Sequence, residues 1–187
     1  MRVMRKNPIL ALSFCMALLA LNATAATIFN TTLLGSNEVP PTGSSGTGTG
    51  VFTLNDAQTT LEVNIAFSGL GTPDSAAHIH CCAPVGANAS VVLSFIPAGF
   101  PLGVTSGTFD HVFTLATDLS GISTAAFLSN LFAGETYANI HTTQFGGGEI
   151  RGQLPAAVPE PGSFAVLGFG LLALAAMRRQ TKRRPHR

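Results

Sequence analysis

The sequence predicts an all-β fold of antiparallel strands, arranged as a sandwich or a barrel. Between its two terminal segments the chain is rich in Gly, Thr, Ser and β-branched residues and almost free of Lys, which favours strands and turns over helices. Apolar and polar residues alternate along 61–68, a pattern that gives a strand one buried face and one wet face. Turns rich in Gly and Pro separate several such runs, as is typical of a sandwich or barrel.

Residues 1–25 have the organisation of a secretory signal peptide. A short basic stretch precedes an apolar run at 9–21, and small residues follow at the cleavage position. The run is shorter than the roughly 20 residues that a stable membrane span needs. We therefore expect signal peptidase to remove this segment during export, and Cys15 with it.

Residues 26–155 have the size of one domain and contain the runs expected to form strands. We expect helical turns only within 118–134, and we expect the Gly-, Ser- and Thr-rich stretch 41–50 to be a loop that enters the sheet. The expected strands lie at 27–35, 48–55, 60–70, 76–82, 90–96, 107–115, 136–142 and 148–154.

Residues 156–187 combine a Pro-broken turn, an apolar run at 164–177 and a basic end. As a helix, the run is too short to cross a hydrocarbon core of roughly 30 Å. The run therefore predicts a short hydrophobic helix that forms a weak or temporary membrane span, with its basic end in the cytoplasm. A simple C-terminal anchor is the alternative.

The order of these parts resembles the PEP-CTERM sorting signal of Gram-negative bacteria that make extracellular polysaccharide. The resemblance implies recognition by an exosortase, a membrane transpeptidase-like enzyme, with cleavage near the Pro-Glu-Pro motif and release or surface attachment of the product. The residues that carry it are Pro159, Glu160, Pro161, Arg178 and Arg179.

Outside the two basic ends the chain is strongly acidic. Arg151 is its only Lys or Arg there, whereas all nine acidic residues follow residue 25, so one cation and nine acids give a charge of −8. Such a surface repels nucleic acid, whose binding depends on Lys and Arg meeting phosphates, and we expect no nucleic-acid partner. No clustered acidic loop of the calcium-binding kind is present in the sequence.

Four stretches of the domain closely resemble the CHRD domain, which is found in chordin and in many secreted bacterial proteins. The resemblance covers about 28–154 and implies an extracellular immunoglobulin-like or superoxide-dismutase-like β-sandwich. One departure is Cys81-Cys82, which stand where family members commonly have Gly-Pro. The fold leaves the activity open, because function belongs to the site. The stretches are Glu-Val-Pro-Pro at 38–41, Ala-His-Ile-His at 77–80, Tyr-Ala-Asn-Ile-His-Thr at 137–142 and Gly-Glu-Ile-Arg-Gly at 148–152.

Three histidines form a candidate metal site. On an extended strand His78 and His80 lie on one face, about 6.6 Å apart along the strand, and Cys82 follows on the same face. His141 lies on the outward face of its own strand, so the three imidazoles converge if the two strands are neighbours or face each other. Three neutral imidazoles suit zinc or copper, and Cys82 is a candidate fourth, softer ligand.

Two other interpretations of these histidines stay open. Histidines on the polar face of a sheet commonly hydrogen-bond to backbone or carboxylate groups and bind nothing; Asp74 and Glu149 are candidate partners. A copper-zinc superoxide dismutase also carries a His-x-His pair on a β-sandwich, but it needs more ligands than this chain supplies. Since hydrolase and phosphate-loop motifs are also missing from the sequence, we expect no catalytic activity.

The adjacent cysteines have three possible states. Their Cα atoms are about 3.8 Å apart across an ordinary peptide bond, below the usual disulfide range, so a bond between Cys81 and Cys82 is expected to be strained. Free thiols of exported proteins tend to oxidise. We expect this vicinal disulfide first, ahead of bridges to other chains and capture by a metal.

Arg151 is expected to form a structural ion pair that holds the last strand against the sheet. Glu149, two residues away, is the first candidate partner, and Glu38 and Glu135 are the others. A substrate-binding arginine is the alternative.

These features together predict an exported, exosortase-sorted protein on the outer surface or in the extracellular matrix of a Gram-negative bacterium, anchored transiently in the inner membrane. We expect its CHRD domain to serve a non-catalytic structural or binding role, with extracellular polysaccharide or matrix as a candidate partner. The alternatives are a module that binds copper or zinc at His78, His80 and His141, and a superoxide-dismutase-like enzyme.

Overall fold

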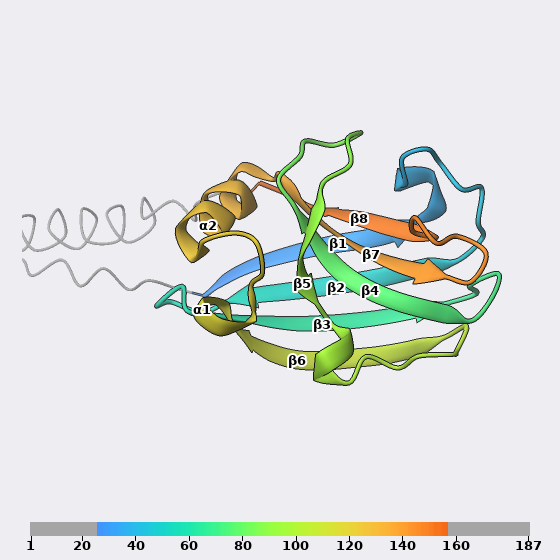
Figure 1. Ribbon diagram of the computed structural model, residues 1–187, viewed down its shortest axis with the longest axis horizontal. Helices are drawn as coiled ribbons and strands as arrows, with labels where there is room; N and C mark the ends of the chain where they lie inside the picture. The colour runs from blue at the N-terminus through green and yellow to red at the C-terminus, as the bar shows by residue number, and fades with distance from the viewer. Residues whose placement is uncertain (1–25, 157–187) are drawn as a thin grey trace, which may run out of the picture.

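The alternating runs of the sequence form strands in the computed structural model, which describes residues 26–156 (Figure 1). Strand boundaries differ from the expected ones by a few residues, because turn residues at the ends of each run leave the ladder. The strands are β1 (Thr27–Leu34), β2 (Thr47–Leu54), β3 (Thr60–Ser68), β4 (Asp74–Cys81), β5 (Ser90–Ser94), β6 (Gly107–Thr114), β7 (Thr136–Thr142) and β8 (Ile150–Leu154).

The strands make one sheet in the order β5-β4-β7-β8-β1-β2-β3-β6, with antiparallel pairing throughout. Its two four-stranded halves meet where Leu34 of β1 pairs with Arg151 of β8. Gly152 permits this close approach, because a Cβ at that position would lie 2.6 Å from Thr31 Oγ1. The antiparallel all-β prediction is therefore confirmed. The expected sandwich of separate sheets is not confirmed, since the β1–β8 ladder makes the sheet continuous.

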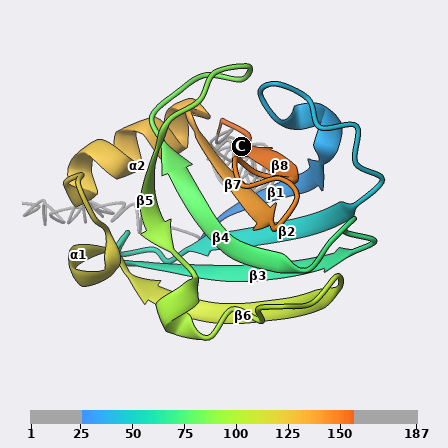
Figure 2. The ribbon, with the colours of Figure 1, turned by 45° about the vertical axis from the view of Figure 1, so that its right-hand side comes forward.

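The sheet curls until its two edge strands approach each other, although β5 and β6 stand at opposite ends of the strand order (Figure 2). Phe95, which follows β5, lies with its ring centroid 5.4 Å from that of Phe109 and 5.7 Å from that of Phe113, both on β6. Phe95 is completely buried, so these rings close the core between the two halves. The inward residues of β3 are those that the alternation predicts, namely Leu61, Val63, Ile65 and Phe67.

Two helices and two 3-10 turns complete the fold of residues 26–156. The expected helical stretch contains α2 (Thr124–Ala133), which begins where the Ser123 side chain accepts a hydrogen bond of 3.2 Å from the Ala126 amide. Phe127 and Leu131, four residues apart, bury one face of α2 in the core. The expectation of helical turns only within 118–134 is wrong, because three short elements lie mainly or wholly outside that stretch: α1 (Leu115–Asp118) and the turns η1 (Gly35–Asn37) and η2 (Ile96–Ala98).

Within residues 26–156 there is no helix that is both long enough and apolar enough to span a bilayer. The signal peptide predicted for 1–25, the hydrophobic helix predicted for 164–177 and the residues of the sorting motif lie outside the described residues.

Replacing the aromatic ring that closes the curl should destabilise the domain strongly. We expect Phe95→Ala to lower the free energy of unfolding by about 3–5 kcal/mol, through lost burial and the cavity it leaves. Urea denaturation of the purified protein measures this, with Val112→Ala on the exposed side of β6 as the control, expected within about 0.5 kcal/mol of the parent. Equal losses in the two variants would show that Phe95 does not close the core.

Candidate metal centre

The pairing of β4 with β7 brings the three predicted histidines together. In this ladder Ala76 pairs with His141, His78 with Asn139 and His80 with Tyr137. Directly paired residues of antiparallel strands point to the same face of the sheet, so the three imidazoles share one face with Asn139. One nitrogen from each imidazole lies within 4.8 Å of the others, and among the described residues no other group of His, Cys, Asp or Glu of this kind is found.

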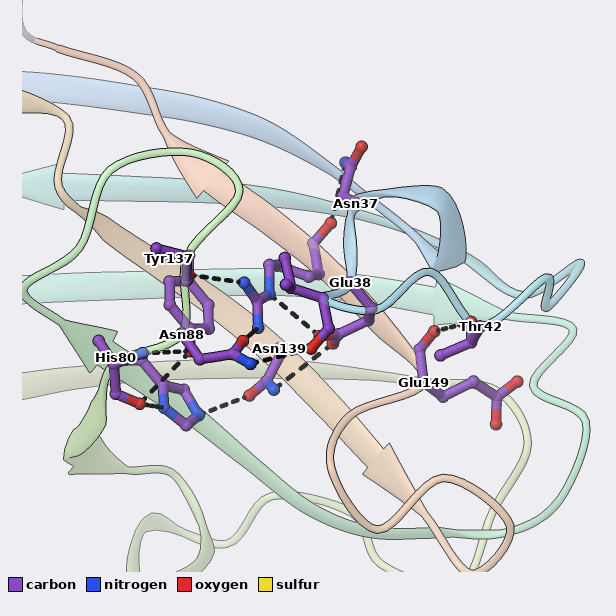
Figure 3. Close-up of polar contacts among 12 residues, drawn as sticks. Asn37, Glu38, Thr42, His80, Asn88, Tyr137, Asn139 and Glu149 are labelled. Atoms are coloured by element: carbon purple, nitrogen blue, oxygen red, sulfur yellow. Dashed lines mark hydrogen bonds and ion pairs between the residues drawn. The ribbon is translucent and has the colours of Figure 1, made fainter.

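This face of the sheet is covered, whereas the alternation predicted an outward, wet face. His80 is 7 % exposed and Tyr137 and Asn139 are each 1 % exposed. The cover comes from two connections, the β1–β2 connection (residues 35–46) and the β4–β5 loop (residues 82–89), which supply Glu38 and Asn88 to the network around these side chains (Figure 3). The polar residues therefore pack inside the protein and need internal partners.

Two contacts fix the His80 ring. Its Nδ1 lies 2.9 Å from the carbonyl oxygen of Ala89, and its ring stacks on Tyr137 with centroids 4.7 Å apart and planes 5° from parallel. A carbonyl oxygen only accepts, so Nδ1 carries the proton and donates it. In the neutral ring Nε2 is therefore an unprotonated lone-pair atom.

His141 is held in the same way by a different loop. Its Nδ1 donates to the carbonyl oxygen of Gly146 at 2.9 Å, which leaves Nε2 with a free lone pair. This Nε2 lies 3.2 Å from Nδ1 of His78. For His78 no backbone acceptor is found in the described part of the chain, so its ring is the least constrained of the three.

Asn139 is a member of the centre that the sequence argument missed. Its Oδ1 lies 3.0 Å from His80 Nε2 and 3.1 Å from His141 Nε2. Its position in the sequence indicates this role, because Asn139 stands two residues before His141 in the Tyr-Ala-Asn-Ile-His stretch and therefore on the same face of the strand. The expected histidine partners Asp74 and Glu149 are wrong, since backbone carbonyls and this amide take those positions.

Burial lowers the pKa of all three imidazoles below the ordinary value. For His78 burial and repulsion from the other two rings lower the pKa to about 4. For His80 and His141 burial is again the main cause, and the nearby Arg151 charge lowers the pKa further, while their backbone hydrogen bonds oppose the shift. The rings are therefore neutral near pH 7, which is the state a metal ion requires.

Arg151 organises the cover over this centre. Its Nε donates to Glu38 Oε2 at 3.0 Å, and both residues are 3 % exposed. The rest of the guanidinium donates to the Ala87 carbonyl at 3.1 Å and to Asn88 Oδ1, and its Cζ lies 3.8 Å from the centroid of the Tyr137 ring. Burial raises the pKa of Glu38 above its ordinary 4.5, and the Arg151 charge opposes that shift.

The prediction that Arg151 pairs with Glu149 is wrong. The carboxylate of Glu149 turns toward the start of β2, where its Oε1 accepts hydrogen bonds from Ser44 Oγ at 2.6 Å and from the Gly71 amide at 2.7 Å. Figure 3 shows the Glu149 side chain directed away from Glu38. Closeness in sequence does not bring the two side chains together here, because Glu149 lies just before β8 begins at Ile150 and its side chain turns to a different partner. The partner is Glu38, one of the other candidates.

Cys81 and Cys82 form a disulfide with each other in the structure. Cys82 lies just past the end of β4 and is exposed, and its sulfur is occupied by the bond. The prediction of Cys82 as a fourth metal ligand is therefore wrong for this state of the protein, because a disulfide sulfur has no thiolate to offer. The first-ranked expectation, a vicinal disulfide, is what the structure contains.

A family model for the CHRD domain matches residues 29–154, and a model for the PEP-CTERM protein-sorting motif matches residues 157–180. No curated protein and no solved structure matches the chain. The second match contains all five residues that the sequence argument assigned to sorting, and this motif implies a protein that is exported and targeted to exosortase.

Breaking the buried ion pair should destabilise the domain. We expect Arg151→Met to lower the free energy of unfolding by about 3–5 kcal/mol, because it leaves the buried Glu38 without its cation. Glu38→Gln should have an effect of the same sign, and the double variant should lose less than the sum of the two single losses, since it removes both charges. Equilibrium denaturation of the parent, the two single variants and the double variant measures these losses. Strictly additive losses would contradict a direct pairing of Arg151 with Glu38.

The lowered histidine pKa values predict a loss of stability in acid for the metal-free protein. As the pH falls from 7 to about 4.5, the unfolded chain binds protons at ordinary histidines while the folded centre does not, so the free energy of unfolding falls. His78→Asn should reduce this loss by about 1–2 kcal/mol, less than the full shift because His78 is partly exposed.

Denaturation curves at several pH values, recorded with chelator, measure this difference. The raised pKa values of Glu38 and Asp74 have the opposite effect, because they increase the free energy of unfolding as the pH falls. Both residues are present in the parent and in His78→Asn, so their effect cancels in the comparison. His80, His141 and Arg151 also remain in both. His111→Asn on β6 is the matched control and should follow the parent curve; the same curve for His78→Asn would contradict a lowered pKa.

Proposed function

The chain belongs to the CHRD domain family, and on that premise we propose that it is an exported, exosortase-processed surface protein whose CHRD domain binds one zinc or copper ion. The ligands are the imidazoles of His78, His80 and His141. Export and targeting to exosortase follow from the sorting motif. The metal-binding role rests on the centre between β4 and β7.

The observation that carries the proposal is the way two of the rings are held. His80 and His141 each donate Nδ1–H to a backbone carbonyl, one in the β4–β5 loop and one in the β7–β8 loop. Histidines that ligate metals almost always donate their other ring N–H to a carbonyl, carboxylate or water, which fixes the tautomer and aims the lone pair. Both Nε2 lone pairs are aimed into the same small space.

The electrostatics of the surroundings support the same role. Burial keeps the imidazoles neutral, so an ion does not have to displace protons near pH 7. The nearby guanidinium of Arg151 is paired with the Glu38 carboxylate, so the centre faces an ion pair and not an isolated positive charge. Imidazole donors suit zinc and copper among the metals that proteins commonly bind.

The domain is non-catalytic in this proposal and holds its ion to stabilise the exported fold. The processed protein acts on the outer surface or in the extracellular matrix of a Gram-negative bacterium, after a transient stage in the inner membrane. Extracellular polysaccharide is its candidate partner there, and the charge of −8 in the region between the basic ends argues against nucleic acid.

A purely structural role without a metal ion is the second candidate function. It is favoured by the hydrogen bonds around Tyr137 and Arg151, which are complete without an ion.

Elemental analysis of the protein purified without chelator tests the proposal. We expect close to one equivalent of zinc or copper in the parent, and an affinity at least about 100-fold lower in a His78→Ala/His80→Ala variant, which loses two ligands. His111→Ala, outside the centre, is the matched control and should bind like the parent. Circular dichroism of each variant checks that the sheet is intact.

A parent protein that stays metal-free after incubation with zinc and with copper would reject metal binding and leave the structural role. Equal metal content in the parent and in a folded double variant would place the ion elsewhere and reject this centre.

A further inference from the structure

Asn139 stands between the imidazoles and the buried ion pair. Its side-chain oxygen faces His80 and His141, and its side-chain nitrogen faces Glu38 Oε1 at 3.5 Å. The side chain is almost completely buried, at 1 % exposure. A Cβ at Gly148 would overlap Glu38 and lie 2.6 Å from Asn139 Nδ2, so the backbone of the β7–β8 loop presses directly on the amide.

The contact with Glu38 favours the orientation in which the amide oxygen of Asn139 faces the histidines. The carboxylate of Glu38 accepts a hydrogen bond from Arg151 Nε, and its other oxygen needs a donor. The amide nitrogen supplies that donor only when the amide oxygen is turned toward the imidazoles. The ion pair therefore favours this orientation over the reverse one, in which the amide nitrogen would face the two imidazoles and the amide oxygen would face the Glu38 carboxylate.

This orientation brings the lone pairs of His80 Nε2 and Asn139 Oδ1 together without a hydrogen between them, whereas His141 Nε2 can accept a hydrogen from Nδ1 of His78 at 3.2 Å. Nε2 of His80 and Nε2 of His141 carry no proton, because each ring has placed its proton on Nδ1 toward a carbonyl. Asn139 Oδ1 is also an acceptor and lies 3.0 and 3.1 Å from these nitrogens. Buried acceptors that face one another are unfavourable unless something electron-poor lies between them, and a cation meets that requirement.

Three of the separations among the four donor atoms match those of neighbours around one ion, and the imidazole nitrogens all lie within 4.8 Å of one another. Donor atoms about 2.0–2.1 Å from a zinc or copper ion are about 2.8–3.4 Å apart when they are neighbours in square-planar or tetrahedral geometry. The two contacts of Asn139 Oδ1, at 3.0 and 3.1 Å, lie in this range, as does the His78–His141 contact at 3.2 Å. His78, whose Nδ1 already lies 3.2 Å from His141 Nε2, completes the set of donors.

We propose that Asn139 Oδ1 is the fourth ligand, so that the ion is held in a closed shell of three imidazole nitrogens and one amide oxygen. The inference rests on the proposed metal binding and goes beyond it, because it assigns the coordination and leaves no position for water or substrate. A catalytic metal keeps such a position open, whereas a structural one does not. Glu38 and Arg151 then act as the outer support that aims the amide oxygen at the ion.

Cobalt(II) replacing the metal in the purified protein tests the assignment, because its visible absorption reports coordination. We expect a four-coordinate spectrum in the parent that azide does not change. Asn139→Ala opens one position, so azide should change its spectrum and its affinity for zinc should fall about 10–100-fold. Asn139→Asp together with Glu38→Gln exchanges the amide and the carboxylate between the two positions, so this double variant keeps an oxygen toward the ion without setting two carboxylates against each other. It should bind zinc at least as tightly as the parent and resist azide.

The matched control is Asn64→Ala, an asparagine on β3 away from the centre, which should behave as the parent. Copper(II) added to the same proteins, followed by electron paramagnetic resonance, shows whether the same nitrogen donors also bind copper. If Asn139→Ala is unfolded by circular dichroism, the Asn139→Asp/Glu38→Gln variant tests the assignment alone. A folded double variant that binds zinc 10-fold or more weakly than the parent overturns the assignment.

The two proposals fail in different ways. A parent that takes up neither cobalt, zinc nor copper removes the metal-binding function itself. A parent and an Asn139→Ala variant that bind with equal affinity and respond equally to azide leave the three-histidine centre in place and remove Asn139 as a ligand.

Discussion

The buried ion pair between Arg151 and Glu38 is the interaction on which the rest of this structure depends. Burying two charges is costly, and the arrangement is stable only when both partners are present and their remaining hydrogen bonds are satisfied. The pair joins β8 to the β1–β2 connection, and the further donors of Arg151 hold the β4–β5 loop at Ala87 and Asn88. Three segments that are distant in sequence are thereby fixed over one face of the sheet.

The histidine centre is a consequence of that cover. The β4–β5 loop, once held by Arg151, presents the Ala89 carbonyl that orients His80, and Tyr137 is enclosed between the Arg151 guanidinium and the His80 ring. The Glu38 carboxylate, already engaged by Arg151, orients the Asn139 amide. Burial then keeps the imidazoles neutral. The Arg151–Glu38 contact therefore supports the position and the burial of the His80 ring, which it does not touch, through Tyr137, Asn139 and the β4–β5 loop.

Much of the candidate site was open to prediction because strands impose a period of two. Residue spacing alone places His78 and His80 on one face of β4, and His141 with Asn139 on one face of β7. The period does not reveal whether loops will cover that face. His80 was expected on a wet surface and is buried, and Asn139 was overlooked because an asparagine in a strand carries no metal-ligand signature by itself. The partner of Arg151 is not predictable from local sequence, because Glu38 lies more than 100 positions away along the chain and meets Arg151 only in the folded domain.

The sequence by itself determined the all-β antiparallel class, the inward residues of the strands, the family and the sorting motif. These follow from local periodicity, composition and short motifs, which do not require knowledge of distant contacts. The tertiary structure alone decided that β1 and β8 join the two halves into one curled sheet, that β4 lies beside β7, and that Glu38 and not Glu149 neutralises Arg151. The physical reason is that strand order and the pairing of buried charges depend on which distant segments meet, and each such meeting is set by the packing of the whole domain.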